Sequence, residues 1–177
     1  MEETRISTER LLLRPYEEAD REPVIRILRN KEISRTFMMP DFEDDAAAEA
    51  LFRKLLIQSH KRDHFELAIC LENKPIGFFN DVKIKDGTIE LGHVIHPDYQ
   101  NQGYATEALT AAIWELFRQG YSAVRAGYFS ENIASARVME KSGMHPISRV
   151  DFIEYRGKTH KCLYYEIRED ISNECTL

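Results

Sequence analysis

The stretch HPDYQNQGYATEAL (residues 96–109) changes from a turn to a helix, and Gly103 stands where the two meet. Residues 103–119 then repeat small and apolar side chains at helical spacing, and Gly120 follows at a position typical of a helix end. The first turn of a helix has unpaired N–H groups and partial positive charge, so it binds an anion that can come close. Gly103 and the small Ala105 leave that approach open. The stretch predicts a phosphate-binding turn at the start of a helix.

The segments before this turn predict a strand, two helices and an antiparallel meander. The strand is expected at residues 10–15, where Pro15 ends it. Apolar residues at helical spacing predict helices at 17–30 and 44–59. Three apolar runs between residues 65 and 97, separated by the turn signals ENKP and KDG, predict three strands joined as hairpins.

The segments after the helix complete the order of elements. A strand is expected at 122–129, and Asn132 is a plausible N-cap for a short helix that ends at Gly143. Two alternating runs around Arg156 and Gly157 predict a terminal hairpin. A strand that leads into the glycine turn and a second strand after the helix form a strand–helix–strand unit, whose turn lies where α/β proteins bind ligands. One mixed α/β layer structure is predicted.

Composition limits the class of protein. The 177 residues are 43% hydrophobic, enough to bury a core as one domain. The net charge of −6 argues against nucleic acid as a partner and favours a cationic substrate. Cys70, Cys162 and Cys175 are odd in number and widely separated, so neither a disulfide framework nor a CxxC metal site is expected. No apolar run is long enough for a membrane span, and the N-terminus lacks a signal peptide's apolar core, so a cytoplasmic location is expected.

Gln100, Gly103 and Ala105 form a Q-x-x-G-x-A pattern, which resembles the pyrophosphate motif (Q/R)-x-x-G-x-(G/A) of the Gcn5-related N-acetyltransferase (GNAT) family. The order of elements resembles that family too. The resemblance implies a GNAT fold over one domain, residues 1–177: a mixed, mostly antiparallel sheet of about seven strands, with about four helices on its faces.

Three segments in sequence order resemble the RimJ/RimL branch of the family, which acetylates the N-termini of ribosomal proteins. They are TERLLLRP (8–15), IELGHVIHPDYQNQGYATEAL (89–109) and SENIASARVMEKSGM (130–144). The resemblance covers nearly the whole chain. It implies transfer of an acetyl group from acetyl-coenzyme A to a primary amine by direct attack within a ternary complex.

The resemblance also implies which residues hold acetyl-coenzyme A. Main-chain groups of one strand would contact the pantetheine and the acetyl carbonyl, the glycine turn would surround the pyrophosphate, and an asparagine would contact the pantetheine arm. In that order the residues are Val94 and Ile95; Gln100, Asn101, Gln102, Gly103, Tyr104 and Ala105; and Asn132. Each also has a structural alternative, as strand core or as a helix cap.

Proton donation to the departing thiolate is implied for Ser135, three residues after Asn132, as in the RimJ/RimL pattern. A first-turn capping serine is the alternative. Many family members have a tyrosine as this acid where the present chain has Met139, which is expected in the core.

A base for the amine is implied at Glu90, which matches an acidic position of the RimJ/RimL branch. A solvated strand-edge glutamate is the alternative reading. His93 and His96 are further candidates by chemistry, although a histidine before Pro97 is typical of a turn. His60 and His64 have i, i+4 spacing, but without nearby acids or cysteines no metal site is expected there.

The acceptor is less defined by the sequence. Tyrosines suit a cleft for a cationic amine, and four are candidates, with sheet packing as the alternative: Tyr128, Tyr155, Tyr164 and Tyr165. A protein N-terminus, a polyamine, an amino acid and an amino-sugar antibiotic all remain open, and a homodimer is compatible with the family. A non-catalytic acyl-coenzyme A sensor, which keeps the cofactor cleft without chemistry, is the rival hypothesis.

Overall fold

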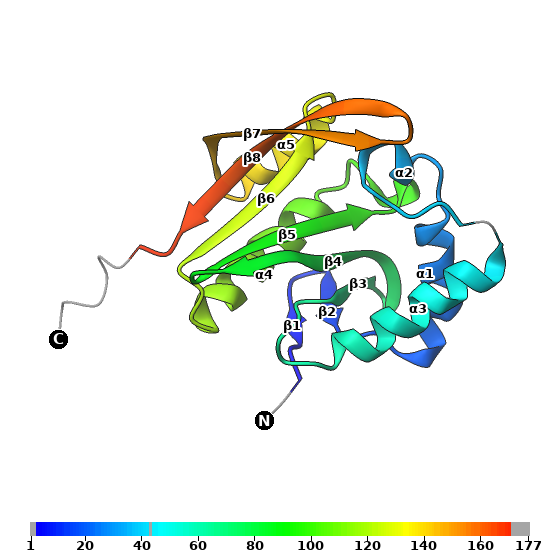
Figure 1. Ribbon diagram of the computed structural model, residues 1–177. Helices are drawn as coiled ribbons and strands as arrows, with labels where there is room; N and C mark the ends of the chain where they lie inside the picture. Colours follow the sequence, from blue (N-terminus) through cyan, green and yellow to red (C-terminus); the bar gives the residue numbers. More distant parts are fainter. Residues whose placement is uncertain (1–2, 43, 171–177) are drawn as a thin grey trace.

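The computed structural model describes residues 3–42 and 44–170, whose strands form one eight-stranded sheet (Figure 1). The hairpin turns lie where the sequence has residues that tolerate a left-handed backbone. Asn73, Gly87 and Gly157 have φ of 67°, 74° and 72°. The strands are β1 (Ile6–Ser7), β2 (Leu11–Arg14), β3 (Leu67–Leu71), β4 (Lys74–Lys85), β5 (Thr88–Ile95), β6 (Ala123–Phe129), β7 (His145–Tyr155) and β8 (Lys158–Arg168).

The order of the strands in the sheet is β1-β2-β3-β4-β5-β6-β8-β7. Every neighbouring pair is antiparallel except β5 and β6, which are parallel. The parallel pairing ends at Leu91 and Ala126, although β5 continues to Ile95 and β6 to Phe129. The carboxyl halves of these two central strands are therefore unpaired with each other, which opens the middle of the sheet.

Helices cover both faces of the sheet and divide the core into two clusters (Figure 1). On one face α4 and α5 contribute Leu109 and Met139, both 0% exposed. On the other face α1 and α3 contribute Ile27 and Phe52. The helices are α1 (Arg21–Leu28), α2 (Ile33–Thr36), α3 (Asp45–Ser59), α4 (Tyr104–Arg118) and α5 (Ile133–Lys141).

The predicted architecture is confirmed, with two short additions. The mixed, mostly antiparallel sheet gains the two-residue strand β1, and the four-residue helix α2 follows α1. The first helix begins at Arg21 rather than at residue 17, because residues 18–20 form a 3-10 turn. Asp20 holds that turn by accepting hydrogen bonds from Glu17 N and from the buried Arg14.

The thiols of Cys70 and Cys162 are free and buried, and Cys175 lies outside the described residues. In the part of the chain that the structure describes, no helix has the length and apolar character needed to cross a membrane.

Candidate active site

The glycine turn has two left-handed residues close together. Asn101 has φ 60° and Gly103 has φ 84°, and Gly103 is the N-cap of α4. The N–H of Glu107 donates to the carbonyl of Gly103 (3.0 Å), as in a regular first turn. No residue that the structure describes accepts a hydrogen bond from the main-chain N–H groups of residues 101–106. These donors remain available to an anion at a helix N-terminus.

Arg10 holds the turn in place, which the sequence did not predict. Its Nη1 donates to the carbonyl of Gln102 (2.9 Å), and its guanidinium lies over the ring of Tyr104, 4.4 Å from the centroid. Its Nε donates to Glu107 Oε2 (2.7 Å), so the N-terminal strand region is tied to α4. The pair fixes both the turn and the helix that follows it.

A cleft of about 560 Å³ lies where β5 and β6 part. Its walls include both unpaired strand ends, through Val94 and Ile95 on one side and Gly127 and Tyr128 on the other. Of the nine residues expected at the cofactor, eight line this cleft: Val94, Ile95, Gln100, Asn101, Gly103, Tyr104, Ala105 and Asn132. The ninth, Gln102, is exposed and points its side-chain amide at the carbonyl of Asp98.

Asn132 and Ser135 lie at the N-terminus of α5, on the same cleft. Asn132 Oδ1 accepts a hydrogen bond from the N–H of Ser135 (3.3 Å), so the capping role is confirmed. Ser135 takes part in this cap through its main chain. Its hydroxyl makes no hydrogen bond to any described residue, which leaves that group free to act in the cleft. Met139 is fully buried in the core, as predicted.

Glu90 does not line the cleft. It is 8% exposed on β5, and its Oε2 accepts a hydrogen bond from Arg149 Nη1 at 2.8 Å. Arg149 also binds Asp151, with Nη2 and Oδ2 2.7 Å apart, and lies over the ring of Tyr164. The carboxylate predicted as a base is therefore held in an ion pair on the sheet.

The two candidate histidines have different environments. His93 lines the cleft, and burial lowers its pKa to about 4, so its imidazole is neutral at pH 7. His96 is buried and structural: its Nδ1 accepts from Asp98 N (3.2 Å), and its Nε2 lies 3.3 Å from the amide of Asn30. The turn role of His96 is confirmed.

Only one of the four candidate tyrosines, Tyr128, lines the cleft. The hydroxyl of Tyr155 donates to the carbonyl of Ser34 (2.8 Å), which joins the β7–β8 hairpin to α2. Those of Tyr164 and Tyr165 donate to Asp151 and Glu140. The hydroxyl groups of these three tyrosines therefore form hydrogen bonds within the sheet or to the helices α2 and α5.

The cleft also has lining residues that the sequence did not point to. Arg137 and Lys141 lie one turn apart on α5, are exposed, and add two positive charges to the lining of the cleft. Glu32, Thr36 and Phe37, from α2 and the residues on either side of it, also line the cleft. A four-residue helix carries too little periodic pattern to be predicted, so this wall became apparent only with the fold.

Comparisons with known proteins agree with this geometry. Residues 10–145 match the family described as Acetyltransferase (GNAT) domain. The chain is 31% identical over 144 residues to the uncharacterized N-acetyltransferase YnaD of Bacillus subtilis (strain 168). The aligned region covers 78% of this chain and 81% of YnaD.

Solved structures share the fold. An acetyltransferase of the GNAT family from Bacillus anthracis has a TM-score of 0.80 and 26% identity, over 93% of this chain and 98% of that one. RimL, a ribosomal L7/L12 alpha-N-protein acetyltransferase in complex with coenzyme A, has a TM-score of 0.80 and 17% identity, over 93% of this chain and 98% of RimL. The chain belongs to the GNAT acetyltransferase family, and it is an N-acetyltransferase that uses acetyl-coenzyme A as co-substrate.

Proposed function

We propose that this enzyme acetylates the α-amine of a protein N-terminus, with acetyl-coenzyme A held in the cleft between β5 and β6. The observation that carries the proposal is the convergence on one cleft of the unpaired ends of both strands, the glycine turn and the free hydroxyl of Ser135. A cofactor and an acceptor that meet in this opening would react directly, without an enzyme-bound acetyl group.

The proposed cofactor position uses the donors described above. The diphosphate binds the unpaired N–H groups of residues 101–105, and the pantetheine lies along Val94 and Ile95, with Asn132 on the opposite wall. Arg137 and Lys141 add positive charge for the phosphate groups, in a chain whose net charge is −6. These contacts bind the cofactor in one orientation, with the thioester toward the gap between β5 and β6.

The chemical step moves two protons. The amine nitrogen attacks the thioester carbonyl carbon, the C–S bond breaks, and the nitrogen loses one proton to solvent water. We assign Ser135 as the donor of a proton to the thiolate sulfur, so that coenzyme A leaves as the thiol and the serine hydroxyl regains a proton from solvent water. A thiol has an ordinary pKa of about 8.5, so the leaving group needs only modest help.

The base determines which amines react well. Glu90 is held by Arg149 outside the cleft, and the pKa of His93, about 4, makes it a weak base. The amine of the acceptor must then already be in its neutral, unprotonated form when it binds. An α-amine has a pKa of about 7.7–8.0 and is partly neutral at pH 7.5, whereas a lysine-type amine at about 10.4 is almost wholly protonated. The weak base therefore favours protein N-termini over polyamines and lysine side chains.

RimL supports the proposal by its name, as a structural neighbour that acetylates a ribosomal-protein α-amine. The fold of the two chains is shared, and so is the use of coenzyme A.

The test measures thiol release from acetyl-coenzyme A with a matched panel of amines at pH 7.5. The panel holds peptides with free N-termini and no lysine, the same peptides blocked at the N-terminus with one lysine added, spermidine, free amino acids and an aminoglycoside. We expect kcat/KM to be at least tenfold higher for free N-termini. A polyamine, an amino acid or the aminoglycoside as the best acceptor would contradict the proposal.

A further inference from the structure

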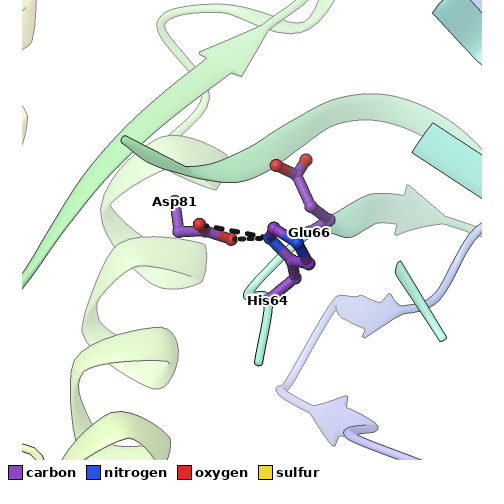
Figure 2. Close-up of side chains that lie close together, drawn as sticks. All are labelled: His64, Glu66 and Asp81. Carbon is purple, nitrogen blue, oxygen red and sulfur yellow. Dashed lines mark hydrogen bonds and ion pairs between the residues drawn. The ribbon is translucent and has the colours of Figure 1, made fainter. Parts of the chain in front are cut away.

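A second group of chemically active side chains lies outside the cleft. His64 and Glu66 precede β3, and Asp81 lies on β4, so two neighbouring strands bring them together (Figure 2). One ligand atom from each residue, a ring nitrogen or a carboxylate oxygen, lies within 4.8 Å of the other two. None of the three lines the cleft. The acetyl transfer described above therefore leaves this group without a role.

Asp81 is held firmly in this arrangement. Its Oδ1 accepts a hydrogen bond from the N–H of Phe65 (2.7 Å). The same oxygen lies 3.2 Å from His64 Nδ1 (Figure 2). The side chains of His64 and Asp81 are 27% and 13% exposed, so an ion from solvent can reach them. Two ligands on one tetrahedral ion with bonds of about 2.1 Å lie about 3.4 Å apart. The imidazole and the Asp81 carboxylate already have nearly this spacing.

Glu66 is a second observation that points to a ligand at this group, because its carboxylate is buried and lacks a hydrogen-bond donor. The residue is 6% exposed, and its Oε2 is buried without a hydrogen-bond partner among the described residues. Burial and the charge of Asp81 raise the pKa of Glu66 to about 8, and the attraction of the Lys54 ammonium only partly opposes this. A buried carboxylate oxygen without a donor is costly, and a cation between Glu66 and Asp81 would remove that cost.

We propose that His64, Glu66 and Asp81 bind one divalent transition-metal ion, with Zn²⁺ as the best match to this set of ligands. One imidazole nitrogen and two carboxylate oxygens are ordinary Zn²⁺ ligands, whereas Mg²⁺ and Ca²⁺ prefer oxygen alone. Water fills the remaining coordination position on the partly exposed side. Small rotations of the side chains close the remaining distances to the ion.

The ion would act on stability rather than on acetyl transfer. It would join the segment before β3 to the middle of β4, and Asp81 pairs in register with Leu91, the last residue of the parallel β5–β6 ladder. Binding to the folded state alone raises the free energy of unfolding. Acetyl transfer is expected to proceed with and without the ion.

The experiment titrates Zn²⁺ into the chelator-treated chain of residues 1–177 by calorimetry, with Co²⁺ as a spectroscopic probe of the ligands. We expect one ion per chain at a micromolar dissociation constant, visible absorption bands typical of four- or five-coordinate Co²⁺, and a higher melting temperature with Zn²⁺. Glu66→Gln and Asp81→Asn should each weaken Zn²⁺ binding at least tenfold. Both variants keep the size of the side chain, and Asp81→Asn also keeps an oxygen that accepts the hydrogen bond from Phe65 N. His145→Gln removes an exposed histidine elsewhere and should leave binding unchanged.

Two results would overturn the proposal. One is the absence of one-to-one binding up to millimolar Zn²⁺. The other is binding that Glu66→Gln and Asp81→Asn leave unchanged, which places the ion elsewhere. Far-UV circular dichroism and acetyl transfer of each variant confirm that it is folded, so that a loss of binding reports on the site and not on the fold.

Discussion

The guanidinium of Arg10 is bound to the carboxylate of Glu107, with Nε and Oε2 2.7 Å apart, across 97 residues of sequence. The same arginine donates to the carbonyl of Gln102 in the glycine turn. Glu107 also accepts hydrogen bonds from the Thr8 hydroxyl and from Arg10 N. The position of the proposed diphosphate site thus depends on a contact outside that site.

Glu107→Gln should raise the KM for acetyl-coenzyme A about three- to tenfold and leave kcat within twofold, because the turn loses its support while the chemistry is untouched. Steady-state kinetics measure both. Glu115→Gln is the matched control: Glu115 pairs with Arg118 at the other end of α4, with Oε2 2.8 Å from Nε. Equal KM changes in the two variants would show that the Arg10 contact has no special role.

Gly103→Ala should weaken coenzyme A binding at least tenfold. The new Cβ would lie 3.3 Å from Arg10 Nη2, at a φ of 84° that alanine adopts at a cost of about 1 kcal/mol. Gly120→Ala has the same backbone cost at φ 93° but meets nothing within 4 Å. We expect similar losses in melting temperature for both and a loss of calorimetric affinity for Gly103→Ala alone. Retained affinity in Gly103→Ala would remove the glycine turn from the cofactor site.

Ser135→Ala should lower kcat about tenfold and keep the dissociation constant of acetyl-coenzyme A within twofold, because only the proposed proton donor is lost. The cap on α5 survives, since it uses the N–H of Ser135. Ser142→Ala, which removes a hydroxyl bound to the carbonyl of Val138, is the control and should affect stability but not kcat. An unchanged kcat in Ser135→Ala would mean that the thiolate leaves without this donor.

His93→Gln and Glu90→Gln separate the two candidate bases. His93 lines the cleft and Glu90 does not, so His93→Gln should lower kcat more than Glu90→Gln does, but by less than about tenfold because His93 is a weak base. Because the pKa of His93 is lowered to about 4, kcat/KM of the wild type should follow the pKa of the acceptor amine above pH 6. A larger loss in Glu90→Gln, with a new inflection in the pH profile, would return Glu90 to the role of base.

Glu66→Gln should change how stability depends on pH. The pKa of Glu66 is raised from 4.5 to about 8, so the folded state holds this proton more tightly than the unfolded chain does. The contribution of protonated Glu66 to the free energy of unfolding is therefore complete below about pH 4.5 and is lost as the pH rises through about 8. In the presence of a chelator, the stability of Glu66→Gln relative to wild type should rise by about 2–4 kcal/mol from pH 5 to pH 9. Denaturant unfolding at both values measures this difference, and a constant difference would contradict the raised pKa.

Much of the fold was predictable because its signals are local. The central helix was expected at 103–119 and runs over Tyr104–Arg118, since small and apolar residues repeat on one face and glycine stands at each end. The meander and the last hairpin were predicted from turn residues. The elements β1 and α2 were missed, because two and four residues carry no period.

The sequence by itself determined the order of the elements, the glycine turn and the resemblance to the family, because each depends on residues that are neighbours along the chain. Only the tertiary structure decided which of the proposed residues share the cleft. It placed Ser135 and His93 there and held Glu90 against Arg149, 59 positions away. Ion pairs and burial between distant segments set these environments, and no local pattern records them.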